Sequence, residues 1–159
     1  MKRGQTRFLQ SVIVLIGIGA LFFLLWEPHV EGRNIHATLF QIYFNDPFLV
    51  WAYTAAISFF VALYQAFKLL EYIGQNKAFS LDSVKALRTI KYCAMVIVGF
   101  IVPAEAYLFM VRPGDDIAGG VAMGIMISCI SIVIATTADI FGKLLQDVVD
   151  MKSKNNLTA

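Results

Sequence analysis

The chain alternates between long apolar stretches and shorter polar ones. Four stretches, at residues 8–26, 47–70, 91–111 and 117–138, are almost entirely apolar, and none has a Lys or Arg in its middle. A helix needs about 20 mostly apolar residues to cross a bilayer, and each stretch satisfies this requirement. The pattern predicts an all-α, polytopic membrane protein in which four transmembrane helices pack as a bundle, with residues 1–159 forming a single domain.

The amino-acid composition supports a membrane protein. Hydrophobic residues make up 58% of the chain and charged residues 15%, whereas soluble domains have about 45–50% and about 25%. So few polar residues could not cover the apolar core of a soluble protein. The net charge of +2 is too small to indicate direct nucleic-acid binding. These values exclude a disordered chain and a disulfide-stapled secreted module, and they argue against a soluble enzyme.

Positive charge is distributed unevenly over the connections between the stretches. Eleven of the 13 Lys and Arg residues lie at the N-terminus, between the second and third stretches, or in the C-terminal tail. Only Arg33 and Arg112 lie on the opposite side. Cytoplasmic loops of membrane proteins carry an excess of Lys and Arg. The asymmetry therefore predicts that the N- and C-termini are both cytoplasmic.

Individual residues mark where helices begin and end. Asp46 and Pro47 predict the start of the second helix, because Asp caps free N–H groups and Pro fits the first helical position. Gly74 suits a left-handed helix end, and Ser80 suits an N-cap. Residues 80–90 then predict an amphipathic helix that lies at the cytoplasmic surface and leads into the third span.

The fourth helix is predicted to continue past the membrane as an amphipathic segment over residues 139–152. An apolar stripe is costly in water, so we expect it to pack against the extension of the second helix near Leu69, Leu70 and Ile73, or against Leu81, Val84 and Leu87. Lipid headgroups or a second protein are the other options. The candidate partner surface consists of apolar residues from the two amphipathic segments: Leu81, Val84, Leu87, Phe141, Leu144, Leu145 and Val148.

Small residues follow one face of the fourth helix. Gly120, Gly124 and Ser128 recur every four residues, and Ser131 and Ala135 extend the same face. Small residues at this spacing let helix backbones approach closely in lipid. The face serves packing within one chain, which is the favoured interpretation, or pairing between two copies in a homo-oligomer.

Glu105 is the one acidic residue well inside a predicted span. A carboxyl group in a membrane is costly and marks a functional site by default, here for proton coupling or cation binding. The alternative is a structural role, as a protonated packing group or a side chain that reaches the outer surface. Its depth in the membrane places Tyr53 and Thr54 of the second helix beside it, so we expect Glu105 to point into the bundle and to hydrogen-bond there.

The sequence contains no catalytic-triad order, Gly-rich phosphate loop or metalloprotease signature. His29 and His36 lack a strong metal-binding spacing. Cys93 and Cys129 fall at different depths of their helices, which disfavours a disulfide. We therefore predict that the protein is not an enzyme and that it holds no cofactor and no metal.

Two segments resemble a known family. The first runs from Ala66 through the Asn-Lys-Ala-Phe-Ser turn at 76–80 to Cys93, and the second runs from Lys143 to Thr158. With the four-span layout they resemble, over essentially the whole chain, the bacterial membrane proteins termed domain of unknown function 2975. The resemblance implies a small multi-pass protein of the bacterial plasma membrane without established catalytic residues. Because members are often encoded beside a small helix-turn-helix regulator, it also implies a cytoplasmic partner of that kind.

These observations favour a non-enzymatic regulatory or interaction protein that acts through its cytoplasmic face, formed by residues 68–91 and 139–152. The alternative function is a small transporter or channel subunit that uses Glu105 and a kink at Pro103. The lipid bilayer is the partner that the composition itself predicts.

Overall fold

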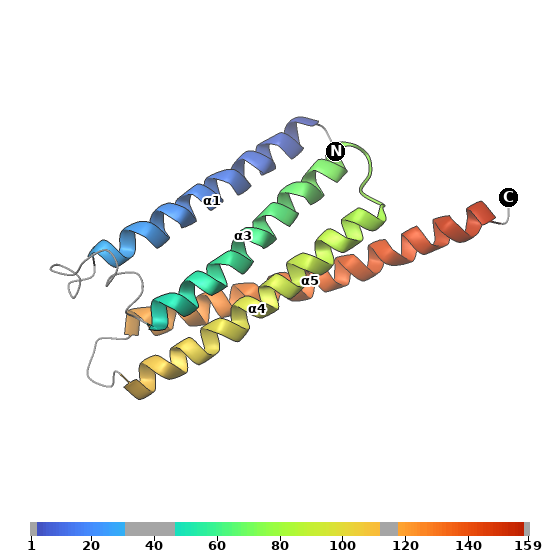
Figure 1. Ribbon diagram of the computed structural model, residues 1–159. Helices are drawn as coiled ribbons and strands as arrows, with labels where there is room; N and C mark the ends of the chain where they lie inside the picture. Colours follow the sequence, from blue (N-terminus) through green and yellow to red (C-terminus); the bar gives the residue numbers. More distant parts are fainter. Residues whose placement is uncertain (1–2, 31–46, 112–117, 158–159) are drawn as a thin grey trace.

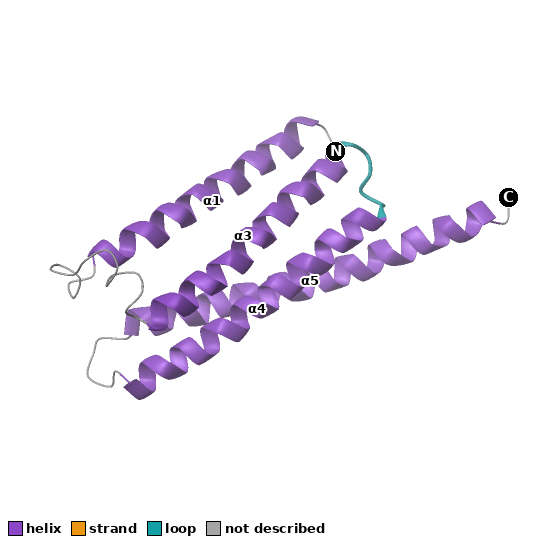
Figure 2. Cartoon of the chain, in the orientation of Figure 1, coloured by secondary structure: helices purple, strands orange, loops and turns teal. Residues whose placement is uncertain are grey.

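The computed structural model describes residues 3–30, 47–111 and 118–157, and all regular structure in these ranges is helical (Figure 2). The helices are α1 (Arg3–Val30), α3 (Pro47–Gly74), α4 (Leu81–Val111) and α5 (Ala118–Leu157). Each of the four is long and apolar enough to cross a membrane. The predicted all-α architecture with four spanning helices is confirmed.

The helices pack in the order in which they occur along the chain. Each helix runs antiparallel to the one before it, and α5 lies behind α4 and crosses it (Figure 1). Helix α1 packs on α3, α3 on α4 and α4 on α5, and no other pair of described helices makes contacts of comparable extent. The architecture is thus an open row of helices. The start of α1, the turn between α3 and α4, and the end of α5 lie at the same end of this row (Figure 1).

The turn between α3 and α4 is fixed by backbone hydrogen bonds. Lys77 donates its N–H to the Tyr72 carbonyl over 2.8 Å, and Asn76 donates to the Ile73 carbonyl over 3.2 Å. This pair of bonds is the Schellman pattern, which needs a left-handed residue directly after the helix. That residue is Asn76, with φ 59°, so the prediction that Gly74 takes this conformation is wrong. On the α4 side, Ser80 Oγ accepts a hydrogen bond from the Ser83 N–H over 3.3 Å, which confirms the predicted N-cap.

Gly74 has a different role, in the contact between α3 and α1. A Cβ atom at this position would lie 3.5 Å from the Cγ2 atom of Thr6, and Thr6 is 3% exposed. Farther along the two helices, Gly17 faces Leu63. The contact between α1 and α3 is narrow. It buries no residue of the most hydrophobic 18-residue stretch of α1.

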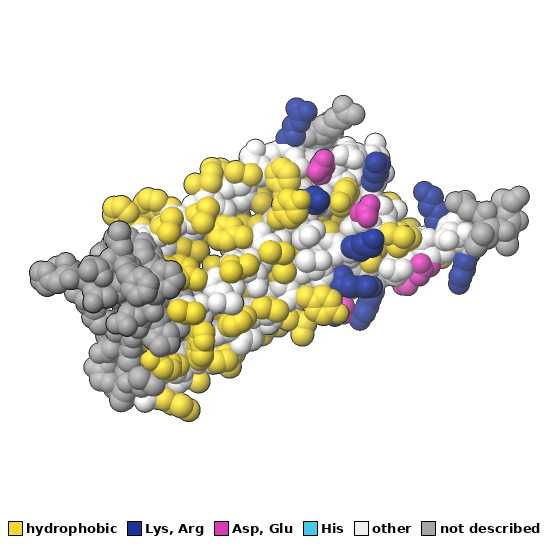
Figure 3. Space-filling model, in the orientation of Figure 1, with side chains coloured by type: hydrophobic (Ala, Val, Ile, Leu, Met, Phe, Trp, Pro, Cys, Tyr) yellow, Lys and Arg dark blue, Asp and Glu magenta, His cyan; other side chains and the backbone are white. Residues whose placement is uncertain are grey.

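Helix α4 holds most of the buried residues of the row. Its Leu87 and Ile90 form a core cluster with Ala138 of α5, and Ala66, Leu69 and Leu145 pack around this cluster. Large apolar side chains elsewhere point outward along the flanks of the helices (Figure 3). In a bilayer such side chains face lipid, which solvates them as well as a protein core would.

The small-residue face of α5 packs on α4 within one chain. A Cβ atom at Gly120 would lie 3.7 Å from Leu108, and one at Gly142 would lie 3.7 Å from Leu87. Ser131 and Ala138 between them are each 5% exposed. The favoured interpretation of this face is confirmed.

One predicted boundary needs correction, and another is confirmed. Residues 80–90 do not form a separate surface helix, because they are the first turns of α4 and carry its buried residues Val84 and Leu87. Residues 139–152 continue the fourth helix as predicted, because α5 runs without interruption for 40 residues. At 1.5 Å per residue α5 is about 60 Å long, roughly twice the thickness of a hydrocarbon core.

Candidate functional site

Glu105 lies on α4 and turns toward α5. A Cβ atom built on Gly124 of α5 would overlap the Oε1 atom of Glu105 and would lie 2.9 Å from its Cδ atom. Only glycine leaves room for the carboxyl group at this place. The small-residue face of α5 thus has two roles. It lets the backbones of α4 and α5 approach closely, and it leaves room for the side chain of Glu105.

The carboxyl group of Glu105 makes no hydrogen bond to the described residues, and its Oε1 atom is buried. The predicted bond to Tyr53 or Thr54 is therefore wrong. Tyr53 donates its hydroxyl to the Leu24 carbonyl of α1 over 3.3 Å, and Thr54 donates to the Val50 carbonyl of its own helix over 2.8 Å. Depth along the helices placed the three residues at one level, but their side chains point to three different neighbours.

The surroundings of Glu105 contain no described charge of either sign. Residues 50–67 of α3, 92–110 of α4 and 118–138 of α5 contain no other Asp, Glu, Lys or Arg. Ser128 of α5, one helical turn from Gly124, has a second buried oxygen without a hydrogen-bond partner among the described residues. The interface between α4 and α5 thus holds two unsatisfied polar groups inside an apolar region.

The end of the row that contains the turn between α3 and α4 is charged, and we term it the basic end. Figure 3 shows Lys and Arg side chains gathered there. The nine cations there whose side chains the structure describes are Arg7, Lys68, Lys77, Lys85, Arg88, Lys91, Lys143, Lys152 and Lys154. Its five described acidic residues are Glu71, Asp82, Asp139, Asp147 and Asp150.

An ion-pair network marks where α4 and α5 leave the apolar region. Asp139 of α5 is bonded to Lys91 of α4 and to Lys143 of its own helix, each over 2.8 Å. Hydrogen bonds from Lys143 and Lys91 lower the pKa of the Asp139 carboxyl to about 2, so the group is ionised at physiological pH. Residues 118–138 before it carry no Asp, Glu, Lys or Arg and span about 31 Å. This length matches the hydrocarbon core of a bilayer, about 30 Å.

The candidate partner surface divides into buried and exposed residues. Val84 and Leu87 are 4% and 8% exposed, and Leu145 packs against the core cluster that contains Leu87. Val148 is half-buried. Val84, Leu87 and Leu145 belong to the interior of the row, so their assignment to a partner surface is corrected, whereas the assignment of Val148 stays a prediction. The internal packing expected for the stripe of the fourth helix is confirmed for Leu145, which lies with Leu69 and Leu87.

The remaining three residues are exposed, but at different depths. Phe141 and Leu144, each 55% exposed, lie about 5 Å and about 9 Å beyond residue 138 along α5, close to the thickness of a headgroup layer, about 5–8 Å. Leu81, 54% exposed, lies about 15 Å beyond Lys91 along α4 and is therefore past the headgroups. Sequence reasoning missed Met151 on α5, which is 60% exposed and lies about 20 Å beyond residue 138.

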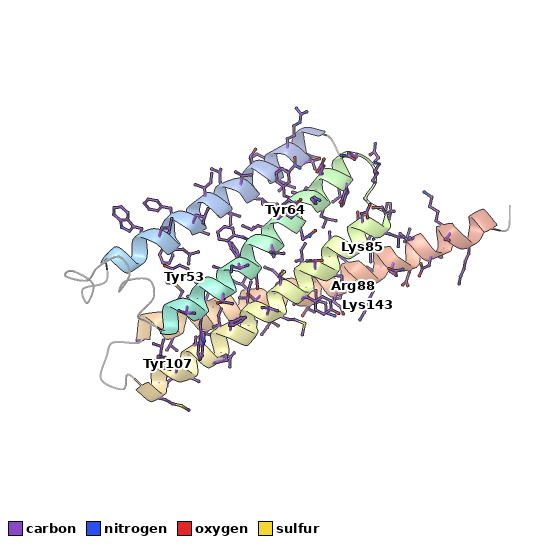
Figure 4. All side chains as sticks on the ribbon, in the orientation of Figure 1. Tyr53, Tyr64, Lys85, Arg88, Tyr107 and Lys143 are labelled. Atoms are coloured by element: carbon purple, nitrogen blue, oxygen red, sulfur yellow. The ribbon has the colours of Figure 1, made fainter. Side chains whose placement is uncertain are left out.

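Basic side chains flank these exposed apolar residues. Lys85 and Arg88 come from α4 and Lys143 from α5, and Figure 4 shows all three on the part of the row near the basic end. Sequence reasoning counted these charges but did not single out the network of Lys91, Asp139 and Lys143. The i, i+4 spacing of Asp139 and Lys143 was the available signal.

No described group of three or more His, Cys, Asp or Glu residues could hold a metal ion. The side chains of His29 and His36 lie outside the described residues. Cys93 and Cys129 are both free. The chemistry that the described residues offer is that of one isolated carboxyl group and one charged helix end.

Comparison with known proteins places the chain in a family. The model of a family described as a protein of unknown function, DUF2975, matches residues 12–159. The chain belongs to the DUF2975 family. This DUF2975 protein is also 42% identical to the uncharacterized membrane protein YoaS of Bacillus subtilis (strain 168), over 161 residues that cover 99% of each chain. No solved structure matches it.

The family assignment confirms the resemblance carried by the turn at 76–80 and the C-terminal segment. With four candidate spanning helices and a relative named as a membrane protein, this DUF2975 chain is a multi-pass membrane protein.

Proposed function

We propose that this DUF2975 protein is a non-enzymatic regulatory or interaction protein of the bacterial plasma membrane, which receives a cytoplasmic partner at its basic end. The observation that carries the proposal is the reach of α4 and α5 beyond the charge layer at Lys91 and Asp139. Leu81 and Met151 are exposed there, 54% and 60%, beyond the depth that lipid headgroups cover. Neither helix needs this length to cross a membrane.

The orientation that this proposal requires is supported by the charge count. The basic end gathers nine cations and five acids with described side chains, and excess Lys and Arg is typical of cytoplasmic segments. Cysteine labelling tests it in a background with Cys93 and Cys129 replaced by Ser. In intact cells, an impermeant thiol reagent should modify Asn34→Cys and spare Asn76→Cys. The reverse pattern would overturn the orientation and the proposal with it.

The charge balance also selects the chemistry of the partner. A surface with more cations than anions favours a partner with an acidic surface, because complementary charge steers encounter and excludes like-charged proteins. The small helix-turn-helix regulator that the family resemblance implies is the partner we propose. It would bind through an acidic, DNA-distal face.

Co-purification from membranes tests this partner. A small helix-turn-helix regulator of the kind that the family resemblance implies is co-expressed with the full chain, and each protein carries a different tag. We expect the double variant Leu81→Asp, Met151→Asp to lose recovery of the regulator while keeping its unfolding midpoint in detergent. The matched control is Gln75→Asp, Ser153→Asp, which adds the same charge at exposed positions of the same end. Equal recovery from both variants would contradict the proposal.

One observation favours a second function, that of a small transporter or channel subunit. It is the Oε1 atom of Glu105, which is buried in the α4–α5 interface without a hydrogen-bond partner among the described residues. Variants of the chain distinguish the two functions. A regulator keeps its effect in Glu105→Gln and loses it in the Leu81→Asp, Met151→Asp variant, whereas a transporter shows the opposite pattern in a vesicle flux assay.

A further inference from the structure

We propose that Glu105 is a proton-binding site, occupied while α4 and α5 are packed together, and that it releases its proton only after its side chain leaves the backbone of Gly124. This inference does not rest on the proposed cytoplasmic partner. It starts from one contact: the carboxyl group fills the space where Gly124 lacks a side chain. Its Oε1 atom is buried there without a hydrogen-bond donor among the described residues.

An ionised carboxylate could not rest in this position at low cost. A charge without water needs an opposite charge or several donors, and it otherwise takes up a proton. The described parts of α3, α4 and α5 supply no such charge at this depth, since residues 50–67, 92–110 and 118–138 hold no Lys or Arg. The proton itself is therefore the ligand that satisfies the site.

The titratable groups near this level cannot take over that role. Within those ranges they are Tyr53 and Tyr64 on α3, Tyr92, Cys93 and Tyr107 on α4, and Cys129 on α5. Phenols and thiols are neutral at physiological pH, so none of them offers a compensating positive charge. Helix α1 packs on α3 and makes no comparable contact with α4, and its residues 8–26 carry no charge.

Release of the proton requires movement of the side chain. Glu105 lies about 9 Å along α4 from the described end at Val111, and Gly124 lies about 9 Å from the start of α5. The carboxyl O–H bond breaks when the group meets water near this end, the proton passes to a water molecule, and the carboxylate stays hydrated. Return to Gly124 requires protonation first. Proton binding at Glu105 is thereby coupled to the packing of α4 against α5.

Infrared spectroscopy of the full chain in phosphatidylcholine vesicles tests the proposal. At about pH 7.5 a glutamate side chain in water is fully ionised. We expect the carbonyl stretch of a protonated carboxyl at this pH in the unmodified protein. The band should be missing in Glu105→Gln and present in Glu71→Gln, which removes an exposed carboxyl at the basic end. Absence of the band from the unmodified protein would overturn the proposal.

Carbodiimide labelling gives an independent readout by intact mass. Dicyclohexylcarbodiimide is lipophilic, and the O–H of a protonated carboxylic acid adds across its C=N bond, so one adduct is expected that Glu105→Gln abolishes. Gly124→Ala should displace the carboxyl group and make Glu105 reactive to a water-soluble carbodiimide instead, whereas Gly119→Ala should not. Protection of Glu105 by Na⁺ at constant pH would overturn the proposal in favour of a metal cation.

Discussion

In each of the two outer helix contacts, between α1 and α3 and between α4 and α5, a glycine packs against a polar side chain. The two contacts differ in the chemistry of that polar group. Gly74 of α3 receives Thr6 of α1, and Gly124 of α5 receives Glu105 of α4. The Oγ1 atom of Thr6 and the Oε1 atom of Glu105 are both buried without a hydrogen-bond partner among the described residues. A threonine hydroxyl carries no charge, whereas a carboxyl group is an acid that can bind or release a proton.

The two contacts also differ in extent. The α4–α5 contact follows a face of small residues from Gly120 to Gly142, while α1 touches α3 at separate points. Close backbone approach over many turns accumulates dispersion energy in a membrane, where apolar burial adds little. The comparison teaches that α4 and α5 share a much more extensive contact than α1 and α3, so α1 is attached more weakly.

The largest effect expected in this comparison comes from the core cluster. Leu87→Ala should lower the free energy of unfolding by about 2–5 kcal/mol, because it leaves a cavity among packed side chains. Leu15 on α1 is 66% exposed, so Leu15→Ala should leave the free energy of unfolding unchanged. Denaturant titration in detergent micelles measures both. Equal losses of unfolding free energy would contradict the conclusion that α1 is attached more weakly than α4 and α5 are to each other.

The next largest effect concerns Gly124. Gly124→Ala introduces a methyl group that overlaps the carboxyl of Glu105, and such overpacking costs about 1–3 kcal/mol. Gly119→Ala, on the same helix with nothing within 4 Å, is the matched control. The double variant Gly124→Ala, Glu105→Ala should recover most of the loss in the same titration. Additive losses would show that the two residues do not touch.

A smaller effect should follow loss of the hydrogen bond between α3 and α1. Tyr53→Phe removes the hydroxyl that donates to the Leu24 carbonyl over 3.3 Å. Such bonds contribute about 0.6 kcal/mol on average in membranes. We expect faster hydrogen exchange in α1 than in the unmodified protein, with unchanged exchange in α5. Protection of α1 at its original level would mean that this bond does not hold it.

The smallest effect should come from the ion-pair network. Lys143 is 74% exposed, whereas Lys91 and Asp139 are each 30% exposed, and water weakens an exposed pair. Lys91→Gln should therefore shift the unfolding midpoint more than Lys143→Gln, and added salt should reduce both shifts. A larger shift for Lys143→Gln would reverse this ranking of the two pairs.

Sequence reasoning identified the helices because their signals are local. Hydropathy over about 20 residues marked the spans, and Pro47 and Ser80 marked helix starts that the structure confirms. The small-residue face of α5 could also be predicted, since the spacing of its residues lies within one helix. What failed was the direction of side chains across helices. Whether Glu105 faces Tyr53 or Gly124 depends on how α4 is rotated between its neighbours, which no local pattern encodes.

The candidate partner surface failed for a related reason. An apolar stripe at the basic end looks the same in sequence whether it is covered by a neighbouring helix or left exposed. Val84 and Leu87 proved to be internal because residues 80–90 continue into α4. The turn at Asn76 was misplaced by two residues, because Gly and Asn both tolerate the left-handed conformation.

The serial order of the helices has a consequence for biogenesis. Each helix makes its extensive contacts with the helix directly before it in the chain. During synthesis, every interface can therefore close as soon as the next helix enters the bilayer, without waiting for a later segment. Contacts between sequence neighbours are also those that form fastest. The protein is thus suited to assemble in the direction of translation, with α5 locking onto α4 as the final step.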